Sequence, residues 1–105
     1  MRFVETPIFT RIATAIWSDD EYHAIQLALF FRPELGPVIP GSGGLRKVRW
    51  SRSGAGKRGG VRVIYDWDAR TETFYMLYAY TKAEQKDLTA RQLRLLSRLV
   101  REELR

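Results

Sequence analysis

Residues 60–81 read GVRVIYDWDARTETFYMLYAYT, two runs rich in β-branched and aromatic residues on either side of a polar segment. Such residues favour extended backbone, so we expect strands at Gly60–Trp67 and Thr73–Thr81. The segment between them, Asp68–Glu72, is too short for the crossover that a parallel pair needs. The two strands are therefore predicted to pair antiparallel and to form the centre of a sheet.

Two further strands are predicted upstream. One covers Leu45–Arg52 and reaches Gly60 through a short loop rich in glycine, lysine and arginine, so it also pairs antiparallel and completes a meander. The other is a short strand at Arg2–Glu5. Prolines and glycines in residues 33–44 mark a connecting loop before the meander.

Three helices are predicted outside the sheet. Apolar residues at helical spacing predict the first at Pro7–Trp17. A capping box at Ser18–Glu21 begins the second, which ends near Arg32 and is apolar almost all round in its later part. Another capping box, Thr89–Gln92, begins a final helix that ends near Leu104. The predicted fold is α+β: a small antiparallel sheet with an N-terminal helical hairpin on one face and a C-terminal helix.

The final helix is amphipathic. Leucine and valine cover one side of it, at Leu93, Leu96, Leu99, Val100 and Leu104. Five arginines fall on the opposite side, Arg91, Arg94, Arg98, Arg101 and Arg105. A solvated face is the commoner explanation of such a stripe, and contact with RNA or the ribosome is the alternative.

Length and hydropathy limit the class of protein. At 105 residues and 12.2 kDa, the chain is expected to form one domain that covers residues 1–105. No apolar run approaches the length of a membrane span, and no apolar signal segment follows the N-terminus. We therefore expect a cytoplasmic protein without membrane contact.

The net positive charge of the chain is confined to one quarter of it. Between Gly41 and Trp67 there are seven lysines and arginines and one aspartate, so 7 − 1 gives +6, which is also the charge of the whole chain. The remaining residues balance to zero. A local basic patch of this kind predicts a polyanionic partner.

Several kinds of catalytic site are excluded by the residues available. The chain has no cysteine and one histidine, His23 on the second predicted helix, so thiolate nucleophiles, cysteine zinc sites and a two-histidine nuclease are impossible. The Gly56-Lys57 pair is not a phosphate-binding P-loop, because Ser51 and Arg58 stand where that motif needs glycine and serine or threonine. Asp19, Asp20 and Glu21 belong to a helix start, and Asp66 and Asp68 flank a turn, so neither group suggests a metal site. We expect no metal and no cofactor.

Strand alternation gathers cations on one face of the predicted sheet. Lys47 and Arg49 share one face of their strand, and Arg62 lies on the face of the next strand that its valines do not use. Tyr80 and Lys82 project to one side if the extended conformation continues past the third strand. Spacing alone favours an anion-binding or solvated surface over a catalytic site.

Three segments form a more specific pattern: GGLRKVR at residues 43–49, GKRGGVRVIY at 56–65 and FYMLYAYTKAE at 74–84. With the two leading helices and the Asp87-Leu88 pair, they resemble the RelE/HigB superfamily of toxins from bacterial type II toxin–antitoxin systems, especially its HigB-like branch. The resemblance implies a ribosome-dependent mRNA endonuclease, or mRNA interferase, that inhibits translation. Such enzymes cut mRNA in the ribosomal A site without a metal, by attack of the RNA's own 2′-hydroxyl on the adjacent phosphate.

The resemblance also implies catalytic residues: Lys47, Arg49, Arg62, Tyr80 and Lys82. Arg62 suits a phosphorane, because its guanidinium donates two parallel hydrogen bonds to oxygens that gain charge. Lys47 or Lys82, crowded by like charges, can lose a proton and act as general base, while another cation protonates the leaving oxygen. Which residue is the base and which the acid is left open. Tyr80 stands in for a tyrosine or histidine that many relatives carry near the C-terminus.

Further cations are expected to bind RNA or the ribosome through phosphates: Arg46, Lys57, Arg58 and Lys86. The implied partners are the ribosome with its mRNA and a cognate antitoxin, expected to be a small helix-turn-helix protein that alone mediates contact with operator DNA. Two alternatives remain. A ParE-like gyrase inhibitor without nuclease activity is disfavoured because such relatives tend to lack the cation cluster, and a plain nucleic-acid-binding module predicts binding without turnover.

Overall fold

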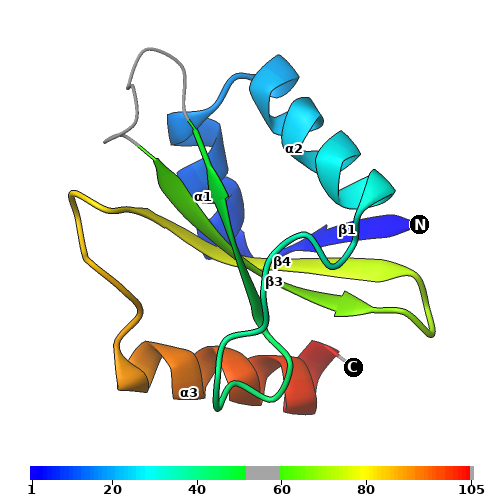
Figure 1. The fold of residues 1–105 in the computed structure, drawn as a ribbon, viewed down its shortest axis with the longest axis vertical. Helices are drawn as coiled ribbons and strands as arrows, with labels where there is room; N and C mark the ends of the chain where they lie inside the picture. The colour runs from blue at the N-terminus through cyan, green and yellow to red at the C-terminus, as the bar shows by residue number, and fades with distance from the viewer. Residues whose placement is uncertain (52–59, 105) are drawn as a thin grey trace.

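Four strands form one mixed sheet in the order β1, β4, β3, β2 (Figure 1). The computed structural model describes residues 1–51 and 60–104. The strands are β1 (Arg2–Glu5), β2 (Arg46–Trp50), β3 (Val61–Asp68) and β4 (Thr73–Thr81). The meander of β2, β3 and β4 is antiparallel, as its short connections predict, whereas β1 extends the sheet by pairing parallel with β4.

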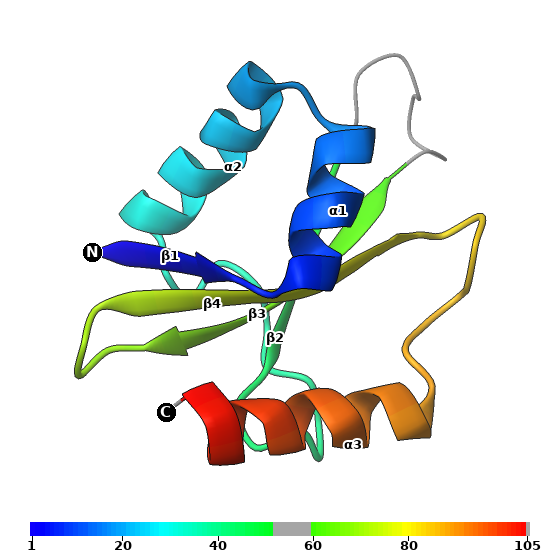
Figure 2. The same ribbon diagram turned by 180° about the vertical axis from the view of Figure 1, so that it is seen from behind.

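Helices cover both faces of this sheet (Figure 2). They are α1 (Pro7–Ile16), α2 (Asp19–Phe31), α3 (Ala90–Leu99) and a π-helical continuation of α3, η2 (Val100–Leu104). Both predicted capping boxes are present, at the starts of α2 and α3. The α+β architecture with an N-terminal helical pair and a C-terminal helix is thus confirmed. No helix among the described residues is long and apolar enough to span a membrane.

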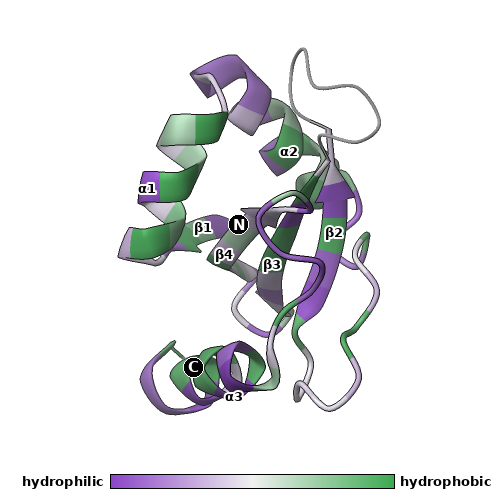
Figure 3. Cartoon of the chain, turned by 90° about the vertical axis from the view of Figure 1, so that its left-hand side faces the viewer, coloured by the Kyte–Doolittle hydropathy of each residue, from purple (hydrophilic) through white to green (hydrophobic). Residues whose placement is uncertain are grey.

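Alternation along the strands divides the apolar side chains between two cores. Val48, Val61 and Val63 belong to the core under α1 and α2. Ile64 and Tyr80 belong to the core under α3. Figure 3 shows the same alternation along β2, where hydrophilic residues lie on either side of one hydrophobic position. Lys47, Arg49 and Arg62 alternate with these valines along β2 and β3, so they face the α3 side of the sheet.

The loop between α2 and β2 holds the outer edge of β2 in place. The amide of Lys47 donates to the carbonyl oxygen of Pro37 at 3.1 Å. Gly36 packs so closely that a Cβ there would lie 2.9 Å from the carbonyl carbon of Lys47. Its amide also donates to the hydroxyl of Tyr65 at 2.9 Å. This loop, called here the edge loop, fixes the strand that carries Lys47 and Arg49.

Candidate active site

Arg49, Arg62 and Tyr80 form a row across three strands on the α3 face of the sheet, called here the cross-strand row. Arg49 lies directly opposite Arg62, and Arg62 directly opposite Tyr80. Opposite residues of antiparallel strands have Cα atoms about 4.5–5.5 Å apart, so the three side chains leave the sheet as neighbours. Lys47 lies two residues before Arg49 on the same face of β2. The predicted convergence of cations and a phenol is found here for these four residues.

The two arginines of the cross-strand row lie directly opposite each other. Arg49 is exposed and Arg62 is half-buried, and neither forms an ion pair with another residue of the ranges 1–51 and 60–104. Like charges directly opposite on a sheet repel each other. A bound anion would relieve this repulsion, so the pair favours a phosphate group between its guanidinium groups.

An open hollow beside these cations provides space for a ligand. Its volume is about 700 Å³, and Lys47, Arg49 and Arg62 contribute the charged part of its lining. The rest comes from the edge loop and from β2, through Leu35, Pro37, Val48 and Trp50. The described lining thus combines cationic and apolar side chains, which suits a nucleotide with its phosphate and its base.

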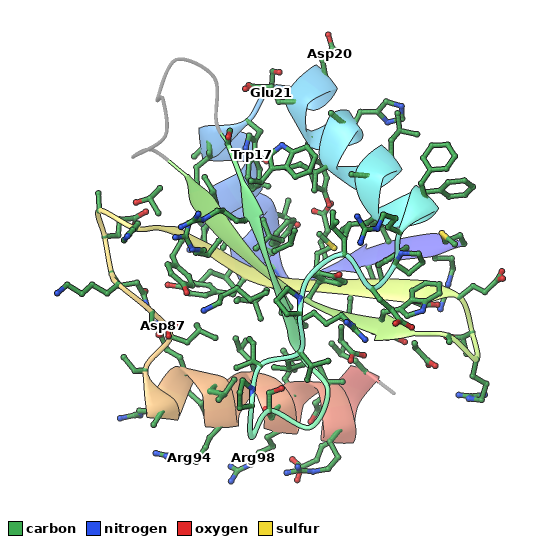
Figure 4. All side chains as sticks on the ribbon, viewed as in Figure 1. Trp17, Asp20, Glu21, Asp87, Arg94 and Arg98 are labelled. Atoms are coloured by element: carbon green, nitrogen blue, oxygen red, sulfur yellow. The ribbon has the colours of Figure 1, made fainter. Side chains whose placement is uncertain are left out.

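Asp87 joins Lys47 to Tyr80. Its Oδ1 atom accepts hydrogen bonds from Lys47 Nζ at 3.1 Å, from the Tyr80 hydroxyl at 3.2 Å and from the Leu88 amide at 2.8 Å. Figure 4 shows Asp87 in the segment between β4 and α3. Sequence reasoning used this residue only as part of the family pattern. The available signal was an acidic residue just before the α3 capping box, in a segment that must return over the cationic face.

These contacts set the protonation states of two groups. Burial raises the pKa of the Tyr80 phenol to about 12, assisted by the charge and hydrogen bond of Asp87 and opposed by the charge of Arg62. The hydrogen bond from Lys47 lowers the pKa of Asp87, and the Leu88 amide acts in the same direction. At neutral pH the site therefore contains a neutral phenol, which can donate a hydrogen bond, beside an ionised carboxylate.

Lys82 lies just beyond the end of strand β4, in the turn that follows it. Strand β4 ends at Thr81, whose carbonyl oxygen accepts from the amides of Glu84 at 3.1 Å and Gln85 at 3.2 Å, so the backbone turns at once. The Thr81 amide donates to Glu84 Oε1 at 3.1 Å, and the Glu84 amide to Thr81 Oγ1 at 3.3 Å. This reciprocal pair is a capping box, readable in the sequence as Thr-Lys-Ala-Glu. The condition for Lys82 to project beside Tyr80, a continuing extended conformation, is not met.

The residues predicted to bind RNA lie in several separate parts of the chain. Arg46 holds the edge loop, because its guanidinium donates to the Gly36 carbonyl oxygen at 2.9 Å and lies 3.7 Å from a carboxylate oxygen of Glu34. Lys86 is exposed in the segment that carries Asp87. Lys57 and Arg58 lie outside the described residues.

Candidate metal ligands do not gather in the described part of the chain, where no group of three or more histidine, cysteine or acidic side chains could hold an ion. His23 is an exposed residue of α2. A comparison of the whole chain with protein-family models found no match.

Proposed function

We propose that this protein is a ribosome-dependent mRNA endonuclease, the toxin of a type II toxin–antitoxin system, acting in the cytoplasm. The observation that carries the proposal is the cross-strand row: two arginines without an ion pair to any residue that the structure describes and a neutral phenol lie in register, with Lys47 held beside them by Asp87. Two parts of the proposal rest on the resemblance to RelE/HigB toxins. One is the dependence on the ribosome, and the other is the partner antitoxin, a small helix-turn-helix protein through which the toxin contacts operator DNA.

The proposed reaction is transesterification within the RNA. The 2′-oxygen of one nucleotide bonds to the adjacent phosphorus, and the bond from that phosphorus to the 5′-oxygen of the next nucleotide breaks. The 2′-hydroxyl loses its proton to a base, and the leaving 5′-oxygen gains one from an acid. The products are a 2′,3′-cyclic phosphate and a 5′-hydroxyl, so no water or co-reactant is consumed.

The site offers a group for each part of this reaction. Arg62 and Arg49 can donate paired hydrogen bonds to the phosphorane oxygens, which carry more charge in the transition state than in the substrate. Tyr80, within the row, and Lys47, beside it, can donate protons, and the ionised Asp87, which accepts hydrogen bonds from both, can accept one. Lys47 is paired with a carboxylate. This pairing supports its role as a charged donor rather than as the base that crowding by cations suggests.

The test is cleavage on programmed ribosomes. Purified ribosomes translating a defined mRNA are mixed with the protein, and new 5′ ends are mapped by primer extension. We expect cuts in the A-site codon from the wild type and from Arg70→Ala, an exposed arginine of the β3–β4 turn that serves as the control. Arg62→Ala should lower the cleavage rate by roughly 10²- to 10³-fold, the cost of removing one donor to a transition-state oxyanion.

Two results would contradict the proposal. Absence of new ends with the wild type, together with salt-dependent RNA binding, would indicate a plain nucleic-acid-binding module. Inhibition of gyrase supercoiling without RNA cleavage would indicate a ParE-like inhibitor. Equal cleavage by wild type and Arg62→Ala would leave an endonuclease but would remove the cross-strand row from its mechanism.

A further inference from the structure

An apolar groove lies between the start of α1 and the middle of α3, two helices that Figure 2 shows on opposite faces of the sheet. It has a volume of about 220 Å³ and is lined by Ile8, Tyr78, Gln92, Leu95 and Leu96. Ile8 is 46% exposed and Leu95 is 53% exposed, although both are large aliphatic residues. Because a cavity of about 150 Å³ accommodates benzene, this groove can take one large apolar side chain.

Arginines border the groove on both helices. Leu95 has Arg91 four residues before it and Arg98 three residues after it, and residues at these spacings lie on the same side of a helix. Ile8 has Arg11 three residues after it on α1. All three arginines are exposed, and none forms an ion pair with another residue of the described ranges. Figure 4 shows Arg98 extending from α3 away from the sheet.

We propose that this groove binds an acidic amphipathic segment of another protein, which inserts one apolar side chain between Ile8 and Leu95. Carboxylates on the same segment pair with Arg91, Arg98 and Arg11. A helix that lays an apolar stripe into a groove is a common form of peptide recognition, and the positive border selects negative charge in the partner. The two exposed aliphatic residues favour a peptide over RNA, because contacts to a phosphate backbone use cations and leave apolar side chains without a partner. This inference does not rest on the proposed endonuclease activity.

The groove is linked to the segment that carries Asp87. Tyr78 and Gln92 line the groove, and both contact Gln85: the Tyr78 hydroxyl donates to Gln85 Oε1 at 3.2 Å, and Gln85 Nε2 donates to Gln92 Oε1 at 2.9 Å. Gln85 Nε2 also donates to the carbonyl oxygen of Asp87 at 2.8 Å. A peptide in the groove thus contacts two residues that hold this segment in place.

The experiment is selection of peptides against the full-length protein from an unbiased display library of random 16-residue sequences. We expect enriched peptides to be acidic, with apolar residues three or four positions apart. Their dissociation constants, measured by fluorescence anisotropy, should rise by roughly tenfold or more for Leu95→Asp and for Arg98→Glu, as for anchor residues of an interface. Arg70→Glu, a charge reversal of an exposed arginine on the β3–β4 turn, should leave them unchanged.

The variants are suited to this test because Leu95 and Arg98 are exposed and their substitution should leave the melting temperature close to that of the wild type. Failure to enrich acidic peptides overturns the proposal, as does binding that Leu95→Asp does not weaken. A 20-nucleotide single-stranded RNA is titrated in parallel. If Arg98→Glu weakens RNA binding while Leu95→Asp alters the binding of neither RNA nor peptide, this surface binds nucleic acid and the peptide proposal is wrong.

Discussion

Replacing Asp87 with asparagine removes the negative charge at the point where Lys47 and Tyr80 meet, while retaining an oxygen that accepts hydrogen bonds. The ion pair with Lys47 is partly exposed, since the two side chains are 31% and 66% accessible for lysine and aspartate, and pairs of this kind contribute about 0.2–1 kcal/mol. The hydrogen bond from the buried Tyr80 also changes from a charged to a neutral acceptor. Together we expect Asp87→Asn to lower the free energy of unfolding by about 1 kcal/mol at pH 7, or ~4 °C in melting temperature.

The loss should depend on pH in a defined direction. Because the folded state lowers the pKa of Asp87, the stabilisation is present above the pKa of an unfolded aspartate, about 3.9, and disappears as the pH falls through the lower folded value. The difference between wild type and Asp87→Asn should therefore be constant from pH 6 to 8 and shrink as the pH falls below about 3.9. Urea unfolding, followed by the fluorescence of the three tryptophans, measures it at each pH.

Glu34→Gln is the matched control. Glu34 also lies beside a cation, but its carboxylate is 3.7 Å from Arg46 and 73% exposed, so its loss should cost less than about 0.5 kcal/mol. Equal stability of wild type and Asp87→Asn at pH 7 would show that the charge of Asp87 does not stabilise the fold. So would a difference that persists unchanged at pH 3, because it could not come from the ionised carboxylate.

Three further results are expected. Since the pKa of Tyr80 is raised to about 12, its contribution to stability is complete below pH 10 and is lost as the pH rises toward 12. Unfolding curves between pH 9 and 11.5 would detect this loss of stability, and Tyr80→Phe should remove the part that Tyr80 contributes. If the full loss of stability persists in Tyr80→Phe, other groups cause it. Gly36→Ala should destabilise the protein by roughly 1–3 kcal/mol, because its Cβ would lie 2.9 Å from the backbone of Lys47, and unchanged thermal unfolding would show that the edge loop adapts. Arg49→Ala should reduce the slope of log binding constant against log salt for single-stranded RNA by about 0.7, one phosphate contact, whereas Arg70→Ala should not; equal slopes would place Arg49 outside the RNA contact.

Most of the secondary structure follows from local patterns. The predicted bounds of β1 and β4 agree with the structure, because runs of β-branched and aromatic residues end there at proline, threonine or charged residues. The starts of α2 and α3 agree because a capping box needs only four consecutive residues. The pairing of β1 could not be predicted in this way. The rule that relates connection length to strand direction applies to neighbours in sequence, and two helices and two strands separate β1 from β4.

In the candidate site too, local sequence patterns predict some positions, whereas others depend on long-range contacts. Period-two alternation is sufficient to place Lys47, Arg49 and Arg62 on one face, because each lies inside a regular strand. It fails for Lys82, where the Thr81–Glu84 capping box ends the extended backbone. The role of Asp87 depends on how the segment after β4 folds back toward β2, forty residues earlier in the chain. The local signal, an acidic residue just before the α3 capping box, does not specify Lys47 and Tyr80 as its partners.

The proposed activity is cleavage of mRNA on the ribosome by the RNA's own 2′-hydroxyl. After the cut is mapped on a programmed ribosome, the same mRNA is prepared with a single 2′-deoxynucleotide on the 5′ side of the scissile phosphate. This one substitution should abolish the cut, while the unmodified mRNA is cleaved to a 2′,3′-cyclic phosphate. Cleavage of the deoxy-substituted mRNA at the same position would show that the 2′-hydroxyl is not the nucleophile.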